Sequence, residues 1–538
     1  MRIPEKRISL AVVAIVLVAG CGQLEPPEAD GQPTANAGNA SPNILFIMVD
    51  DMGLTDLGSF GGEIPTPNLD TLAIEGVRLT NFHVGPICMV TRAMLMSGLS
   101  NREAGVTAHN DPLRSDVASL PERLRALGYH TYMAGKWNLG LSREQSPAAR
   151  GFESSFALMP PADNHLGHSN FADDFGAYLE NGAPTSLPEA WYSSQLFTDK
   201  LISYIETNSG DGTPWFGYLA LTAPHWPLQA QEDWIDRHAG RYDAGYDVVR
   251  EARVRRAREL GVLPHELSLE GYVGRAPRWE DLDASKRAGL ARAMEIYATM
   301  TENMDMHIGR LLDYLRESGQ FDNTVIVFTS DNGASGSDST FAPRTMPRTD
   351  TNNSFANMGR EWSYTAYGRG WAEAAMAPYR DVKGALHSGG TIAATFVHHS
   401  SVARQGGIED TYLTVMDLLP TFVDIASGSA AGSRFEGRDV QVVRGRSFWP
   451  LVIGEAFGER SEAVPWMTVD HRRALVRWPW KVVTSQAQGP RPDGPLQWSL
   501  FDLESDPGER HDLSAEHPDL KAELIASWED YGRHLESL

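Results

Sequence analysis

The chain has 538 residues, of which 42% are hydrophobic and 22% charged, the composition of a globular protein with a substantial core. Its formal net charge is −23, which argues against recognition of a nucleic-acid backbone. A basic run, Arg250–Arg258, has acidic neighbours in a helical pattern and is interpreted as a solvated helix face. We therefore expect no nucleic-acid partner.

The N-terminal residues have the pattern of a bacterial lipoprotein signal. Basic residues precede the apolar segment Ile8–Ala19, which is too short to span a bilayer. The sequence Val18-Ala19-Gly20-Cys21 resembles a lipobox, which implies cleavage before Cys21 and a lipid on its thiol. We expect residues 1–20 to be a signal peptide and the mature protein to be exported as a membrane-anchored lipoprotein, on the periplasmic or outer-membrane side. An ordinary signal peptide with an incidental cysteine is the alternative.

The chain contains two cysteines, Cys21 and Cys88. If Cys21 carries lipid, Cys88 has no partner for an intramolecular disulfide, and a lone thiol in an exported protein needs a chemical reason. Residues 21–42 are rich in Pro, Ala, Gly and Asn and are predicted to be a flexible tether. We assign residues 43–432 to a catalytic domain and residues 433–538 to a C-terminal subdomain.

Two apolar runs are followed by oxygen-bearing side chains. Ile44–Val49 and Val325–Phe328 have the continuous hydrophobicity of strands buried on both faces, as in a parallel sheet. Ligands bind at the carboxyl ends of such strands. The residues found there are Asp50, Asp51, Asp331 and Asn332. Three carboxylates and one amide oxygen suit a hard cation such as Ca²⁺ or Mg²⁺; a solvated Asp pair in a turn is the alternative for the first run.

The stretch Gly85–Gly98 is predicted to be a loop that turns into a helix, with Cys88 at or just before the first turn. A helix N-terminus favours an anion because its backbone N–H groups are unpaired. Arg92 follows Cys88 by four residues and so lies on the same helix face. A nucleophile-type side chain beside a fixed cation indicates a catalytic centre, and a buried structural cysteine is the alternative.

Other candidate site residues lie close to predicted strands. Lys136 follows one strand and stands between glycines, and His225 follows another and stands between two prolines. Lys383 and His387 precede a further strand that ends at His398. A surface lysine and a structural turn histidine are the alternatives for the first two residues.

The remaining pattern predicts an α/β fold with a second, smaller sheet. Amphipathic helices are expected at Leu120–Leu127, Arg287–Gly319 and Thr414–Ile425. Residues 229–283 are interpreted as an irregular insertion, and residues 341–369 as a loop that rims the site. Short strands within residues 466–502 predict a small antiparallel sheet, closed by a helix over residues 518–538.

Three motifs carry a family resemblance. They are Cys88-Met89-Val90-Thr91-Arg92 with a helix ending Ser97-Gly98, then Gly135-Lys136-Trp137-Asn138, and finally Leu500-Phe501-Asp502-Leu503 with Asp506-Pro507-Gly508. Together they resemble the sulfatases, the arylsulfatase branch of the alkaline-phosphatase superfamily. The resemblance implies an alkaline-phosphatase-like fold: a large mixed, mostly parallel sheet sandwiched by helices, plus a small C-terminal antiparallel sheet with a closing helix.

The resemblance also implies catalytic roles. A formylglycine-generating maturation enzyme oxidises Cys88 to 3-oxoalanine (formylglycine), whose hydrated aldehyde is the nucleophile. The divalent cation, Ca²⁺ or Mg²⁺, is bound by Asp50, Asp51, the modified Cys88, Asp331 and Asn332. Arg92 holds the modified residue. The substrate, a small aryl or carbohydrate sulfate, contacts Lys136, His225 and Lys383, with Asn138 and His387 also on the substrate side.

Two positions depart from the family pattern. Val90 stands where the family has Pro, a position that the maturation enzyme reads, and Asn138 stands where the family has a His that accepts a proton. Sulfate-ester hydrolysis is the leading hypothesis. A phosphodiester or phosphonate monoester hydrolase of the same superfamily and a non-catalytic binder of sulfated ligands are the alternatives.

Overall fold

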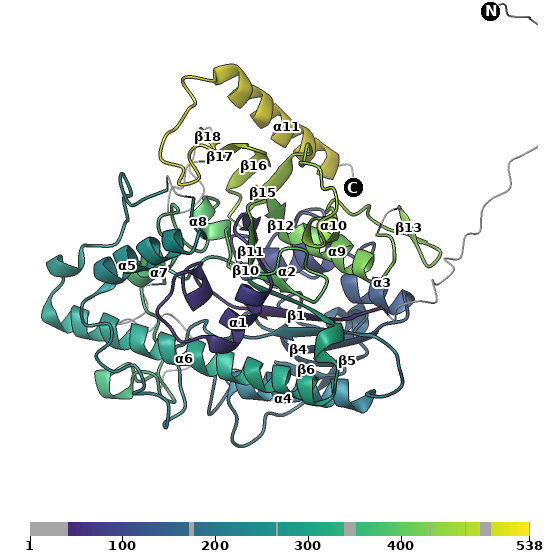
Figure 1. Ribbon diagram of the computed structural model, residues 1–538, viewed down its shortest axis with the longest axis horizontal. Coiled ribbons are helices and arrows are strands. Elements are labelled where there is room, and N and C mark those ends of the chain that lie inside the picture. The colour runs from purple at the N-terminus through teal and green to yellow at the C-terminus, as the bar shows by residue number, and fades with distance from the viewer. Residues whose placement is uncertain are drawn as a thin grey trace, which may run out of the picture. The chain divides into compact units, whose positions relative to one another are not determined.

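A ten-stranded sheet runs through the computed structural model of the protein (Figure 1). In spatial order its strands are β11 (Gly407–Glu409), β2 (Val77–Leu79), β10 (Thr395–His398), β9 (Thr324–Ser330), β1 (Asn43–Val49), β8 (Trp215–Ala220), β4 (His130–Lys136), β5 (Ser154–Leu158), β6 (Tyr178–Glu180) and β7 (Ala183–Pro184). The central strands β9, β1, β8, β4 and β5 are mutually parallel, whereas β10 and β6 pair antiparallel to their neighbours. The sheet is therefore mixed and mostly parallel, which confirms the predicted fold class.

The structure describes residues 41–536 apart from 170, 172–176, 265–266, 338–350, 431, 469 and 485–496. The described elements belong to the compact unit Ser41–Leu538. The predicted signal peptide, Cys21 and most of the tether lie outside the described residues, as do residues 341–350 of the predicted rim loop. No helix within the described residues is long and apolar enough to cross a bilayer.

Helices cover both faces of the sheet because its central strands carry apolar side chains on both faces. One hydrophobic cluster joins Leu45, Ile47 and Val49 of β1 to one set of helices. That set is α1 (Pro67–Glu75), α4 (Ser193–Thr207), α5 (Tyr246–Glu259), α6 (Ala284–Glu317) and α7 (Arg369–Met376). Figure 1 shows α4 and α6 along this side of the strands. The amphipathic helix predicted over residues 287–319 is thus α6, a packing helix of 34 residues.

The opposite face of the sheet packs in a second cluster that contains Ile44, Phe46 and Met48. Its helices are α2 (Cys88–Ser97), α3 (Leu120–Ala126), α9 (Leu418–Ile425) and α10 (Trp449–Val452). The short helix α8 (Ser388–Thr391) precedes β10, and two further strand pairs join β3 (Phe82–His83) to β12 (Leu413–Thr414) and β13 (Arg434–Phe435) to β14 (Arg438–Asp439). The helix α2, which begins at the lone described cysteine, is thereby embedded between the sheet and α9.

The C-terminal segment forms the predicted small antiparallel sheet. Its strands are β15 (Val464–Met467), β16 (Arg473–Arg477), β17 (Trp480–Thr484) and β18 (Trp498–Asp502). The closing helix α11 (Pro518–Glu536) packs on one face of this sheet through Leu524 and Trp528. The other face contributes Trp466, Val476 and Phe501 to the second cluster of the main sheet.

Candidate active site

Cys88 is the first residue of α2 and is 8% exposed. Ile87 before it is extended, and α2 ends at Gly98, whose left-handed backbone (φ 65°) lets its N–H donate to Met94. The Cys88 thiol is free and lies 3.2 Å from Asn138 Oδ1. Asn138 has φ 58°, a left-handed conformation that asparagine tolerates. The structure thus places Cys88 at the helix start, as the sequence predicts, and puts Asn138 against it.

Arg92 and Thr91 fasten α2 to the ends of two strands. The buried Arg92 donates from Nη2 to Asp331 Oδ2 at 2.8 Å, and from Nη1 to the carbonyl of Lys136 at 2.6 Å. Thr91 Oγ1 donates to the Asp331 carbonyl at 2.5 Å and accepts the N–H of Gly85 at 2.7 Å. Three of these hydrogen bonds fix the position of α2, and with it residue 88, relative to the ends of β9 and β4, and the fourth ties α2 to the loop before it.

The carboxylates that follow β1 are paired with two lysines. Lys136 Nζ lies 2.6 Å from Asp50 Oδ2, and both side chains are fully buried. Lys383 Nζ contacts Asp51 Oδ1, to which Asn332 Nδ2 also donates at 2.6 Å. These residues come from the ends of β1, β4 and β9 and from the loop before α8, so the strand register brings distant parts of the chain to one charged centre.

The charges in this centre shift one another's pKa. Burial would raise the pKa of Asp50, but Lys136 and His225 hold it below its ordinary value. Burial would likewise lower the pKa of Lys136, but Asp50 and the Cys88 sulfur raise it. The pKa of Asp331 is raised by burial and by Asp50, in spite of Arg92. Asp51 likewise raises the pKa of Lys383, so both lysines and Arg92 remain cationic at neutral pH.

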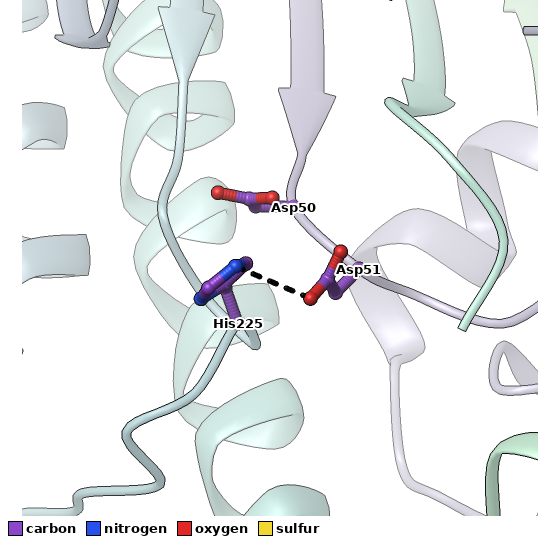
Figure 2. A group of neighbouring side chains, drawn as sticks. All are labelled: Asp50, Asp51 and His225. Atoms are coloured by element: carbon purple, nitrogen blue, oxygen red, sulfur yellow. Dashed lines mark ion pairs between the residues drawn. The ribbon is translucent and has the colours of Figure 1, made fainter. Parts of the chain in front are cut away.

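His225 lies beside the same carboxylates (Figure 2). Its Nε2 is 3.4 Å from Asp51 Oδ2, and its Nδ1 contacts the carbonyl of Trp226. Burial lowers the pKa of His225, although Asp51 opposes the shift. Asp50, Asp51 and His225 each offer a ligand atom within 4.8 Å of the others. This is the arrangement of a metal site, and Asp331 and Asn332 adjoin it through hydrogen bonds to Asp51.

Unpaired oxygens mark the site as suited to a cation. Asp50 Oδ1 and Asn332 Oδ1 are buried and have no hydrogen-bond partner among the described residues, and Asp51 Oδ2 has none beyond its 3.4 Å ion pair with His225. An unpaired buried carboxylate oxygen costs free energy, which a bound cation removes. Hard oxygen donors of this kind suit Ca²⁺ or Mg²⁺. The residues present therefore fit the divalent cation that the sequence predicts.

His387 is the predicted site residue that the structure does not bring to this cluster. Among the described residues, its Nδ1 lies 2.8 Å from Asp381 and its ring packs at 6.0 Å on Phe501. Lys383, four residues earlier, reaches Asp51 instead. The other predicted residues of the domain do meet at one centre: Asp50, Asp51, Cys88, Arg92, Lys136, Asn138, His225, Asp331, Asn332 and Lys383.

Sequence reasoning missed residues that support the centre. Tyr218 on β8 accepts from Arg92 Nη1 at 3.2 Å. The buried His165 bonds the carbonyl of His225 at 2.8 Å and Ser193 Oγ at 2.7 Å. A hydroxyl within the apolar run of β8 is a signal that could have identified Tyr218. His165 lies in an irregular segment with no periodicity to indicate it.

Comparisons with known proteins agree with this geometry. Residues 42–429 match the family model described as Sulfatase. The chain is 36% identical over 523 residues to an uncharacterized sulfatase of Schizosaccharomyces pombe, covering 91% of this chain and 93% of that protein. It is 34% identical to an arylsulfatase of Klebsiella aerogenes over 72% of this chain and 86% of that enzyme.

A solved structure in complex with its substrate, D-glucosamine-2-N,6-O-disulfate, superposes with a TM-score of 0.63 at 20% identity. The match covers 92% of this chain and 98% of that one. At 20% identity it shows that the two chains share a fold. The family model spans most of the chain, including every residue of the charged centre. The chain belongs to the sulfatase family.

Proposed function

We propose that this sulfatase hydrolyses aryl or small carbohydrate sulfate esters with a formylglycine made from Cys88 and a divalent cation. Its family makes it a sulfuric ester hydrolase, and its relatives do not favour a phosphodiester or phosphonate substrate. One observation carries the finer proposal: Cys88 lies at the start of α2, and Arg92, one turn further on, bonds Asp331 and the carbonyl of Lys136, whose ammonium group pairs with Asp50. Such a centre suits a nucleophile that attacks an anionic ester.

The cation would be held by Asp50, Asp51, Asp331 and Asn332 together with residue 88, and His225 is a further donor in reach of the same carboxylates. When bound, the cation supplies positive charge that favours loss of a proton from the nucleophile and offsets charge developing on the sulfuryl group. Elemental analysis of the purified protein would distinguish Ca²⁺ from Mg²⁺.

The chain's own residues would orient and neutralise the sulfate. Arg92, fixed by three hydrogen bonds, holds residue 88 in place from one turn along α2. Lys136 and Lys383 are cations on either side of the carboxylates and would bind the sulfuryl oxygens. His225 Nδ1 faces the Trp226 carbonyl and would donate to it, so the nitrogen that could accept a proton is Nε2, which lies 3.4 Å from Asp51 Oδ2.

The test combines one mass and one rate. The protein is produced in a host with a formylglycine-generating enzyme, and the mass of its proteolytic peptide with Cys88 is measured by mass spectrometry. The same preparation is assayed for hydrolysis of aryl and carbohydrate sulfates. We expect an aldehyde mass, and turnover that Cys88→Ala abolishes. An intact thiol in an active preparation would contradict formylglycine. An intact thiol with sulfate binding but no turnover would identify a sulfated-ligand binder, the alternative that Asn138 and Val90 favour.

The proposed location is a membrane, reached through export and a lipid on Cys21. The basic, apolar and lipobox segments of residues 1–21 support it. Full-length protein expressed in a bacterial host should partition into the detergent phase, and Cys21→Ser should move it to the aqueous phase. Aqueous partitioning of the unaltered protein would contradict the anchor.

A further inference from the structure

Aromatic side chains continue outward from the catalytic histidine. The Trp226 ring lies nearly parallel to that of His225, with centroids 5.2 Å apart and planes 23° apart. Tyr364 meets Trp226 at 5.4 Å and 88°. Two residues away, Trp362 stacks on His168 at 3.8 Å and 21°. We call Trp226, Tyr364, Trp362 and His168 the aromatic wall.

Exposure rises along the aromatic wall. His225 and Tyr364 are 7% and 4% exposed, Trp226 is half-buried, and Trp362 is 38% exposed. The wall thus begins beside Asp51 and ends at the protein surface. Trp226 is the ring of the wall that both stacks on His225 and is partly open to solvent, so the organic part of an ester could reach it.

The aromatic wall is held in place by hydrogen bonds between three segments. The N–H groups of Leu228 and Ala230 donate to the carbonyls of Thr365 and Gly359, each at 2.9 Å. Gln229 fills the space between the segments, accepting the His165 N–H at 2.8 Å and donating to the Ser363 carbonyl at 3.1 Å. A surface fixed in this way loses little conformational entropy when a ligand packs on it.

The charged side chains around the aromatic wall are paired with one another. Glu361 lies 3.0 Å from His168, and Arg360 lies 3.0 Å from Glu232. The cations at the ester itself, Lys136 and Lys383, belong to the charged centre. The wall therefore offers ring surface to a neutral, flat group, whereas a second sulfate or a carboxylate on the substrate would gain little from it.

From these contacts we infer that the aromatic wall binds the organic group of the ester and that this group is an aromatic ring. The inference deepens the proposed sulfate-ester hydrolysis and rests on it. Trp226 would contact the substrate ring, in the offset or edge-on geometries that aromatic pairs prefer, and the buried Tyr364 would hold the Trp226 ring in place. Trp226 is then a specificity residue and Tyr364 a positioning residue, separate from the groups that act on sulfur.

The experiment compares substrates and variants with verified formylglycine and metal content. The rate constant kcat/KM is measured for 4-nitrophenyl sulfate, hexyl sulfate and N-acetylglucosamine 6-sulfate. Trp226→Ala should lower kcat/KM for the aryl ester about tenfold, chiefly through KM, and change the hexyl ester by less than about twofold. Trp226→Phe should restore most of the loss, and Tyr364→Ala should reproduce part of it if Trp226→Ala fails to fold.

Trp480→Ala is the matched control, because Trp480 is also partly buried and packs on a histidine, His517, at 5.3 Å, but in the C-terminal sheet. It should leave the aryl-to-hexyl ratio unchanged. An equal loss for both esters in Trp226→Ala would overturn the inference, since the wall would then act by supporting His225. A loss confined to the carbohydrate ester would also overturn it, because the wall would bind sugar.

If the proposed hydrolysis itself is wrong, the experiment gives a different result from a failure of the aromatic wall. If the unaltered protein hydrolyses none of the three esters, calorimetry compares phenyl sulfate with methyl sulfate as ligands. Tighter binding of phenyl sulfate that Trp226→Ala removes would support the aromatic wall without any turnover. Equal binding of the two ligands would overturn it.

Discussion

Asn138 is the residue at which this charged centre departs from the sulfatase pattern. Its Oδ1 lies 3.2 Å from the Cys88 sulfur and its Nδ2 is buried without a hydrogen-bond partner among the described residues. An amide can orient the nucleophile, but it cannot take up the proton that a histidine would accept. We expect the proton to leave by another group, and His225 is the histidine nearest the carboxylates.

Asn138→His tests the missing proton acceptor. General-base assistance is worth about 10²–10⁴-fold, so kcat should rise at least about tenfold even with imperfect placement. The measurement is kcat per mole of formylglycine, with Asn138→Ala as the control that should not rise. Unchanged turnover in Asn138→His would show that the existing proton path does not limit the reaction.

Asp331→Asn tests the metal assignment. Asparagine keeps the shape beside Arg92 and Asp51, whereas alanine would leave a buried arginine unpaired. We expect lower metal content by elemental analysis, and kcat reduced about a hundredfold or more. Asp305→Asn, a buried carboxylate that caps α1 through Leu69, should keep its metal. Full metal content in Asp331→Asn would remove Asp331 from the ligands.

At the scale of elements, α5 supports the loop that follows Asp50 and Asp51. Arg253 on α5 pairs with Asp56 at 2.6 Å and with Glu63 at 2.7 Å. Asp56 in turn accepts the N–H of Gly53, two residues after Asp51, at 2.7 Å. The insertion between β8 and α6 therefore carries a helix, α5, whose Arg253 stabilises the loop after Asp51 through Asp56 and Glu63. We call these contacts the brace.

This brace predicts acid sensitivity. Burial would raise the pKa of Glu63, but Arg253 lowers it from 4.5 to about 2. The stabilisation is thus complete above pH 4.5 and is lost as the pH falls towards 2. Glu63→Gln should cost about 3 kcal/mol at pH 7 and flatten the acid side of a melting-temperature profile. Glu504 is exposed, so Glu504→Gln should change neither the stability at pH 7 nor the melting-temperature profile. If Glu63→Gln also leaves the profile unaltered, the ion pair of Glu63 with Arg253 does not stabilise the fold.

Elements with a continuous apolar run or a clear hydrophobic periodicity were predictable from the sequence, and elements without either were not. The apolar runs of β1 and β9 located both pairs of oxygen ligands, because strands of a parallel sheet end at one edge. The strand β5 and the helix α7 were not identified, since serines, glycine and alanines blur their periodicity, and β6 has only three residues, too few to show an alternation. The sequence offers His387 as a substrate-side residue, whereas in the structure its Nδ1 pairs with Asp381 at 2.8 Å, a contact that no sequence pattern indicates.

The described part of the chain, within the unit Ser41–Leu538, is expected to unfold as one unit, although its small C-terminal sheet is separate from the main sheet. The small sheet shares a hydrophobic cluster with the main one, and Lys481 of β17 pairs at 2.9 Å with the buried Glu509, which accepts the N–H of Ser388 at the start of α8. Calorimetry should show a single transition. Lys481→Met should destabilise it by about 3–5 kcal/mol, because it leaves Glu509 unpaired. The exposed Lys286→Met serves as control, and two separate transitions would contradict the shared core.

If Cys88 is converted to formylglycine as proposed, the burial of α2 requires the conversion to take place before the chain folds. Cys88 is 8% exposed and Val90 is fully buried, so the sequence that a modifying enzyme must read is hidden once the chain has folded. Adding the formylglycine-generating enzyme to folded thiol protein should leave its mass unchanged, whereas adding it during refolding should yield the aldehyde. Each molecule would then become active or inactive once, before it folds. Conditions that slow folding would raise the active fraction without altering a single catalytic residue.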